Sequence, residues 1–144
     1  MIQVCCTKII KREDIVAQDQ NKELKKILLV DDEEDIRKTV AFQLKVAGYE
    51  VITAVDGEEG LEKARSEAPD LIILDLMLPK IEGHKVCGLL KNDTRYKSIP
   101  IILFTARVRK EDVELSEEVG ADVYITKPFE TSDLIGKVEE LICK

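Results

Sequence analysis

The chain has 144 residues, 44% hydrophobic and 35% charged, a composition that suits one globular domain with a single buried core. Its formal net charge of −7 argues against a general affinity for DNA, RNA or anionic membrane surfaces. No apolar run approaches the roughly 20 residues that a membrane span needs, and the N-terminus lacks the pattern of a signal peptide. We therefore expect a cytoplasmic protein without direct nucleic-acid binding or membrane insertion.

Residues 1–24 differ in pattern from the remainder of the chain. They include the polar stretch "KREDIVAQDQNKEL", which has no clean period. Their four basic and four acidic residues cancel, so the net charge of −7 falls on residues 25–144. We expect an N-terminal extension, flexible or with one short helix, attached to a single compact domain over residues 25–144. The four cysteines match no zinc-site spacing and are interpreted as reduced thiols.

From Lys25 onward, strand and helix patterns alternate. "KILLVDD" predicts a first strand that ends in acids. Apolar residues then recur at helical spacing, at Ile36, Val40, Leu44 and Ala47. Gly48 ends this predicted helix, and "YEVITAV" predicts a second strand. Asp56 is positioned to cap the next helix, which ends before Pro69.

The second half of the domain repeats this alternation. "DLIILD" predicts a third strand, and a loop through Pro79 leads to a helix from about Gly83 to Leu90. "IPIILFT" predicts the fourth strand, and a weaker helix, roughly 109–119, ends at Gly120. "ADVYITK" predicts the fifth strand. The last helix carries a further apolar set, Leu134, Val138, Leu141 and Ile142.

These five β–α units predict an α/β fold. Four of the strands are nearly continuous apolar runs, as expected where helices cover both faces of a sheet. Crossover helices give parallel strands with right-handed connections. We therefore expect an open, doubly wound, five-stranded parallel sheet with helices on both faces. A TIM barrel needs eight such units and is excluded by length.

Reactive side chains follow four of the predicted strands. Asp31 and Asp32 end the first strand, and Asp75 ends the third. In an open parallel sheet, ligands bind beyond the carboxyl ends of the strands. If the first and third strands are neighbours, three carboxylates converge and repel by several kcal/mol, on the order of 4 kcal/mol for a pair at 4 Å. A divalent cation relieves that repulsion, and oxygen-only ligands favour Mg²⁺ over zinc.

The fourth and fifth strands end in Thr105 and in Lys127, which precedes Pro128. A hydroxyl and an ammonium beside acids and Mg²⁺ suit a bound phosphoryl group, for which lysine acts as a point charge. A carboxylate can also be the nucleophile that takes the phosphoryl group and forms an aspartyl phosphate. Asp75, alone at the end of the central strand, is the candidate acceptor.

The set "VDDEED", "DLIILDLMLPKIEG", "IILFTA" and "GADVYITKPF" resembles the receiver domain of two-component response regulators, of the single-domain, chemotaxis-regulator-like kind. The resemblance covers residues 25–144 and implies the flavodoxin-like strand order 2-1-3-4-5. It implies that Asp75 accepts a phosphoryl group from a sensor histidine kinase or a phosphotransfer protein. The domain would assist its own phosphorylation and dephosphorylation without being an enzyme in the ordinary sense.

The resemblance also implies the other roles at the site. Asp32, Asp75 and the backbone carbonyl of Met77 would bind Mg²⁺, and Asp31 would help to position the ion. Thr105 would hydrogen-bond to the phosphoryl group, and Lys127 would form an ion pair with it. The small Ala106 would leave the phosphoryl group room to enter. The Lys127–Pro128 peptide bond would be cis and would aim the lysine inward.

Tyr124 matches the family's switch aromatic. The resemblance implies that, on phosphorylation, Thr105 moves toward the phosphoryl group and Tyr124 turns inward. The face made by the fourth helix, the fifth strand and the last helix would then change and bind an unknown downstream protein. An alternative is that Tyr124 is a packing residue. We expect no output domain after the last helix and therefore predict action through another protein.

Two other classes share parts of this pattern. Phosphatases of the haloacid dehalogenase type also use an aspartate, Mg²⁺, a hydroxyl and a lysine, but their nucleophile follows the first strand in an Asp-x-Asp pattern. A flavin or nucleotide binder would need a Gly- or Ser/Thr-rich loop after the first strand, where this chain has the acidic "DDEEDIRK". His84, the only histidine, is predicted to face solvent.

Overall fold

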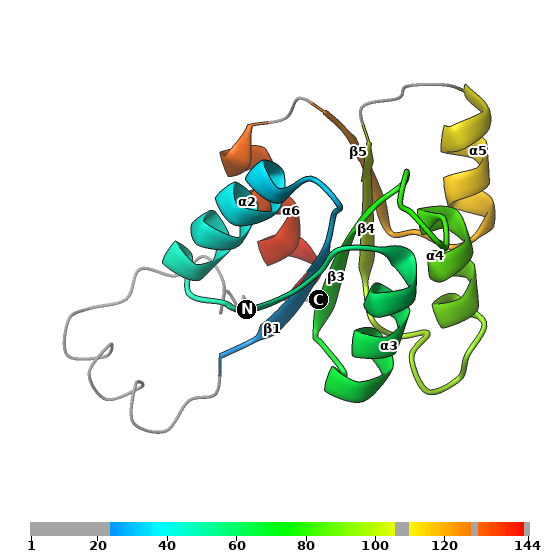
Figure 1. The fold of residues 1–144 in the computed structure, drawn as a ribbon, viewed down its shortest axis with the longest axis horizontal. Helices are drawn as coiled ribbons and strands as arrows, with labels where there is room; N and C mark the ends of the chain where they lie inside the picture. The colour runs from blue at the N-terminus through cyan, green and yellow to red at the C-terminus, as the bar shows by residue number, and fades with distance from the viewer. Residues whose placement is uncertain (1–23, 106–109, 128–129, 143–144) are drawn as a thin grey trace, which may run out of the picture.

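The computed structural model describes residues 24–105, 110–127 and 130–142 (Figure 1). Ala106, Pro128 and nearly all of the predicted extension lie outside this part of the chain. The elements are β1 (Lys26–Val30), α2 (Glu34–Val46), β2 (Glu50–Ala54), α3 (Gly57–Glu67), β3 (Leu71–Asp75), α4 (Gly83–Lys91), β4 (Ile101–Thr105), α5 (Lys110–Glu118), β5 (Val123–Thr126) and α6 (Thr131–Ile142). The predicted order of strands and helices is confirmed.

The five strands form one parallel sheet in the order β2-β1-β3-β4-β5, which confirms the predicted flavodoxin-like fold. Figure 1 shows α2 and α6 on one face of the sheet and α3, α4 and α5 on the other. β3 and β4 are buried along their whole length because helices cover both of their faces. This explains why their sequences are continuous apolar runs rather than alternating ones.

Two apolar layers hold the helices against the sheet. One contains Leu44 of α2 and Leu134 of α6, together with sheet residues such as Ile73 and Phe104. The other contains buried residues of α3 and α4, including Leu61 and others that face Leu74 and Leu103. Neighbouring strand residues point to opposite faces, so each central strand contributes to both layers. None of the described helices is both long enough and apolar enough to cross a membrane.

The helix boundaries follow local chemistry. Asp56 caps α3, because its side chain accepts a hydrogen bond from the Glu59 amide at 2.8 Å. The same helix stops at Ala68, which adopts the left-handed conformation with φ 46° immediately before Pro69. Gly48, with φ +103°, follows the end of α2, where a residue without a side chain is favoured. The predicted cap and both predicted helix ends are therefore confirmed.

The expectation that His84 faces solvent is wrong. His84 lies in the first turn of α4 and is buried, with 7% of its surface exposed. The start of α4 is held close behind the end of β3, because the Gly83 amide donates to the carbonyl of Leu76 at 2.9 Å. A Cβ at Gly83 would lie 2.3 Å from the carbonyl oxygen of Asp75. This close approach buries His84, and the local sequence does not indicate it.

Candidate functional site

Three carboxylates meet beyond the carboxyl ends of β1 and β3. One oxygen from each of Asp31, Asp32 and Asp75 lies within 4.8 Å of the others, in a geometry that could hold a metal ion. The register explains this meeting, because Val30 of β1 pairs with Leu74 of β3 and each is followed by an acid. Asp31 and Asp75 are buried, and Asp32 is exposed. The sequence prediction that these three acids converge is confirmed.

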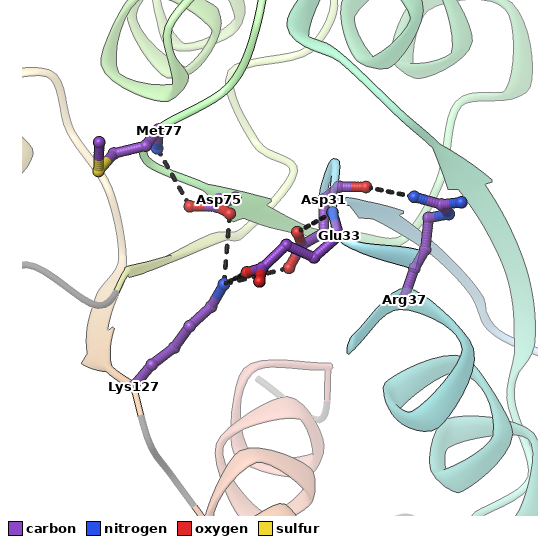
Figure 2. Close-up of polar contacts among 6 residues, drawn as sticks. All are labelled: Asp31, Glu33, Arg37, Asp75, Met77 and Lys127. Carbon is purple, nitrogen blue, oxygen red and sulfur yellow. Dashed lines mark hydrogen bonds and ion pairs between the residues drawn. The ribbon is translucent and has the colours of Figure 1, made fainter. Parts of the chain in front are cut away.

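Backbone hydrogen bonds hold Asp31 in place (Figure 2). Its side-chain Oδ1 accepts from the amide of Glu33 at 2.8 Å, and its own amide donates to the carbonyl of Ala54 at 3.1 Å. Its carbonyl accepts from Nη1 of Arg37 at 2.9 Å. The fully buried carboxylate thus has a fixed orientation, and the contact from Arg37 ties it to the first turns of α2.

The Asp75 carboxylate is held between a backbone amide and a lysine. Its Oδ1 accepts from the Met77 amide at 3.0 Å, and its Oδ2 lies 3.3 Å from Nζ of Lys127. The Met77 side chain is half exposed and points away from this contact, so Met77 acts on Asp75 through its backbone (Figure 2). The part played by the Met77 carbonyl stays a prediction.

Lys127 crosses the site from the end of β5. Its ammonium lies 3.3 Å from one oxygen of each of Asp31, Glu33 and Asp75. It also lies 4.6 Å from the centre of the Phe104 ring, a cation–π contact. The Lys127 amide donates to the carbonyl of Thr105 at 2.7 Å, which anchors the base of the side chain to β4.

Burial sets the charge state of the acceptor candidate. Desolvation raises the pKa of Asp75 from 3.8 to about 6, and the nearby Asp31 charge adds to the rise. The Met77 amide and the Lys127 ammonium act in the opposite direction and limit it. At pH 7 the carboxyl group is therefore still mostly ionised. A carboxylate of this kind is both available as a nucleophile and poorly solvated.

The same contacts act on the lysine. Burial by itself would lower the pKa of Lys127, but the charges and hydrogen bonds of Asp75 and Asp31 outweigh it, so the pKa is raised. The ammonium is therefore fully protonated at neutral pH. It is the one cation among the described residues that contacts both Asp31 and Asp75, so the cluster retains excess negative charge.

This excess charge and the donor set fit a hard divalent cation. The three acids offer oxygen ligands only, which Mg²⁺ prefers, and one of them, Asp32, is exposed and open to hydrated ions. Zinc would favour histidine or cysteine. His84 and Cys87 both lie in α4 rather than in this cluster.

Thr105 and Tyr124 lie on the neighbouring strands. Thr105 is fully buried at the end of β4, where it pairs with Thr126 of β5. Tyr124 pairs with Leu103, two residues before Thr105, so Thr105 and Tyr124 point to the same face of the sheet. Tyr124 is half-buried against the apolar layer of α3 and α4. The structure therefore places the two predicted switch residues on one face.

Sequence reasoning missed Glu33 and Arg37. Glu33 contacts Lys127, and Arg37 fixes the backbone of Asp31. Both follow the acid pair within one or two helical turns. Charged residues are common at solvent-exposed helix starts, so their presence there does not indicate a role in the site. Only the position of Lys127, 94 residues further along the chain, distinguishes Glu33 from its neighbours.

A family model for the response regulator receiver domain matches residues 27–139. The alkaline phosphatase synthesis transcriptional regulatory protein PhoP of Bacillus subtilis is 47% identical over 118 residues, which are 82% of this chain and 48% of that protein. Protein PilG of Pseudomonas aeruginosa is 37% identical over 114 residues, covering 79% of this chain and 84% of that protein. The chain spans about half the length of PhoP and of several other curated relatives.

Solved structures of response regulators are also similar to this chain. Chemotaxis protein CheY4 of Vibrio cholerae has 34% sequence identity and a TM-score of 0.78, with 83% of this chain and 99% of that chain covered. The Mn²⁺-bound form of response regulator Rcp1 has 32% identity and a TM-score of 0.70, with 81% of this chain and 91% of that chain covered. With the five-stranded sheet and its carboxylate cluster, these matches show that the chain belongs to the receiver-domain family of two-component response regulators.

Proposed function

We propose that Asp75 is the phosphoacceptor of this receiver domain. The observation that carries the proposal is the Asp75 carboxylate itself, which is buried, lies within 4.8 Å of carboxylate oxygens of Asp31 and Asp32, and contacts the Lys127 ammonium at 3.3 Å. A carboxylate oxygen of Asp75 attacks the phosphorus of a phosphohistidine on a histidine kinase or phosphotransfer protein. The phosphorus–nitrogen bond breaks, its electron pair stays on the imidazole, and an aspartyl phosphate forms.

The surrounding residues supply binding and charge compensation. Lys127 pairs with the oxygens of the transferred group, and the Thr105 hydroxyl donates to one of them. Asp32, Asp75 and the Met77 carbonyl would hold Mg²⁺ with help from Asp31, and the bound ion would supply charge compensation for the phosphoryl oxygens. Support comes from the converging acids and from the Mn²⁺-bound Rcp1 structure. The domain assists its own phosphorylation and dephosphorylation without being an enzyme in the ordinary sense.

Phosphorylation would act through the switch residues. Thr105 and Tyr124 share one face of the sheet, so a displacement of Thr105 toward Asp75 opens space beside Tyr124. The surface of α5, β5 and α6 then changes and binds a downstream protein rather than nucleic acid.

We place the receiver at residues 25–144 in the cytoplasm, with residues 1–24 as an extension. The cis Lys127–Pro128 bond remains part of the proposal, and Pro128 lies outside the described residues.

The proposal is tested by labelling the protein with acetyl phosphate or a small phosphoramidate in the presence of Mg²⁺. Intact-mass measurement should show one added phosphoryl group on the parent, and none on Asp75→Asn. Asp32→Ala should lose labelling, because a metal ligand is removed. Equal labelling of Asp75→Asn and the parent would reject Asp75 as the acceptor.

A further inference from the structure

Lys127 also contacts a third acid, Glu33, to which the resemblance assigns no role. Oε1 of Glu33 lies 3.3 Å from Nζ of Lys127, the same distance as the contacts from Asp31 and Asp75 (Figure 2). An ammonium has three N–H donors and no acceptor. Three carboxylates at equal distance therefore occupy the whole hydrogen-bonding capacity of the lysine.

The three contacts differ in how easily they are released. The carboxylates of Asp31 and Asp75 are buried and are each tied to a backbone amide, at 2.8 and 3.0 Å. The Glu33 side chain is 59% exposed. It makes no capping hydrogen bond to α2, although Glu33 occupies the N-cap position. Water can replace Lys127 around the Glu33 carboxylate at little desolvation cost, so Glu33 is the partner that Lys127 releases first.

We propose that Glu33 is a positioning residue that holds Lys127 in the unphosphorylated site and competes with the phosphoryl group for it. The inference rests on the function proposed for Asp75 and adds a control on that site. When Asp75 carries a phosphoryl group, its oxygens need a donor from Lys127. Glu33 must then withdraw into solvent, and its negative charge opposes the arriving dianion until it does so.

The proposal predicts the direction in which the affinity for a phosphoryl mimic changes. Neutralising Glu33 while keeping its shape should strengthen the binding of a phosphoryl mimic, because it removes both the competitor for Lys127 and a like charge. An exposed ion pair contributes only modestly to binding, so we expect about a two- to five-fold change. Most of the change should disappear in about 1 M salt, where charges separated by more than a few ångströms are screened.

The test compares Glu33→Gln with Glu34→Gln in the full chain. Glu34 is the matched control, because it also starts α2, is 62% exposed and pairs with Lys38 instead of Lys127. Beryllofluoride affinity is measured by calorimetry at saturating Mg²⁺. We expect a two- to five-fold lower Kd for Glu33→Gln and an unchanged Kd for Glu34→Gln. An unchanged or higher Kd for Glu33→Gln, or an equal decrease in both variants, would overturn the proposal.

A second measurement reports on Lys127 without any ligand. The side-chain ammonium signal of Lys127 in a ¹H–¹⁵N spectrum, assigned with Lys127→Arg, should shift in Glu33→Gln and stay in place in Glu34→Gln. An unshifted signal would remove the contact on which the inference rests. If the parent itself fails to bind beryllofluoride, the phosphoacceptor function fails and the inference falls with it. If the parent binds and only the difference between variants is missing, the role of Glu33 alone is rejected.

Discussion

The charge on Asp75 should make the folded protein less stable at neutral pH than an uncharged variant. The pKa of Asp75 is raised from 3.8 to about 6, mainly by burial. Between these two values the folded state binds a proton that the unfolded chain has released. The free energy of unfolding therefore falls as the pH rises from about 4 to about 7. Asp75→Asn removes this titration and should be more stable than the parent above pH 6.

The size of the effect follows from the same two pKa values. The two pKa values differ by about 2 units, and each unit corresponds to 1.36 kcal/mol. The ionised Asp75 can therefore lower the free energy of unfolding by at most about 3 kcal/mol. The uncharged amide of the variant would lose the charge attraction of Lys127, which still has Asp31 and Glu33 as partners. The amide oxygen can keep the hydrogen bond from the Met77 amide. We therefore expect Asp75→Asn to be stabilised by about 1–3 kcal/mol at pH 8.

Urea unfolding of both proteins from pH 4 to pH 8 measures this difference. A chelator keeps divalent cations away, because a cation bound to the acids would stabilise the parent selectively. The difference between the two proteins should be largest at pH 8 and should close near pH 4, where Asp75 is protonated in the folded parent. A parent as stable as the variant at pH 8, or a difference independent of pH, would refute the assignment of a desolvated carboxylate.

Two further predictions concern the support of the site and the limits of the domain. Gly83→Ala should destabilise the fold by about 1–3 kcal/mol and weaken beryllofluoride binding, because its Cβ would meet the Asp75 carbonyl at 2.3 Å. Gly136→Ala, in α6 with nothing within 4 Å of its Cβ, should instead stabilise by up to about 1 kcal/mol in the same urea experiment. Deleting residues 1–24 should leave phosphoryl labelling at the parental rate, and a lost signal would show that the extension is needed.

Much of this molecule was predictable from local patterns. The apolar runs before Asp31, Asp75 and Thr105 are strands, with Asp75 and Thr105 as last residues and Asp31 directly after β1. Helical spacing and the Asp56 cap gave the correct helices, because capping and hydrophobic periodicity act within one or two turns. Because the carboxyl ends of parallel strands meet at a common edge, the sequence alone predicted that the acids converge.

Tertiary structure decided what depends on distance and burial. His84 is buried because α4 packs directly behind the end of β3, and Gly83, which allows this, carries no local signal of it. Glu33 reaches Lys127 across 94 residues of sequence, which its helix-start position does not indicate. The raised pKa of Asp75 likewise requires that the packed sheet buries the carboxyl group away from water. The residue types and their order determine which reactive groups stand at the strand ends. The ionisation of Asp75 and the ion-pair partners of Lys127 depend on tertiary structure, because burial and contacts between distant residues exist only in the folded protein.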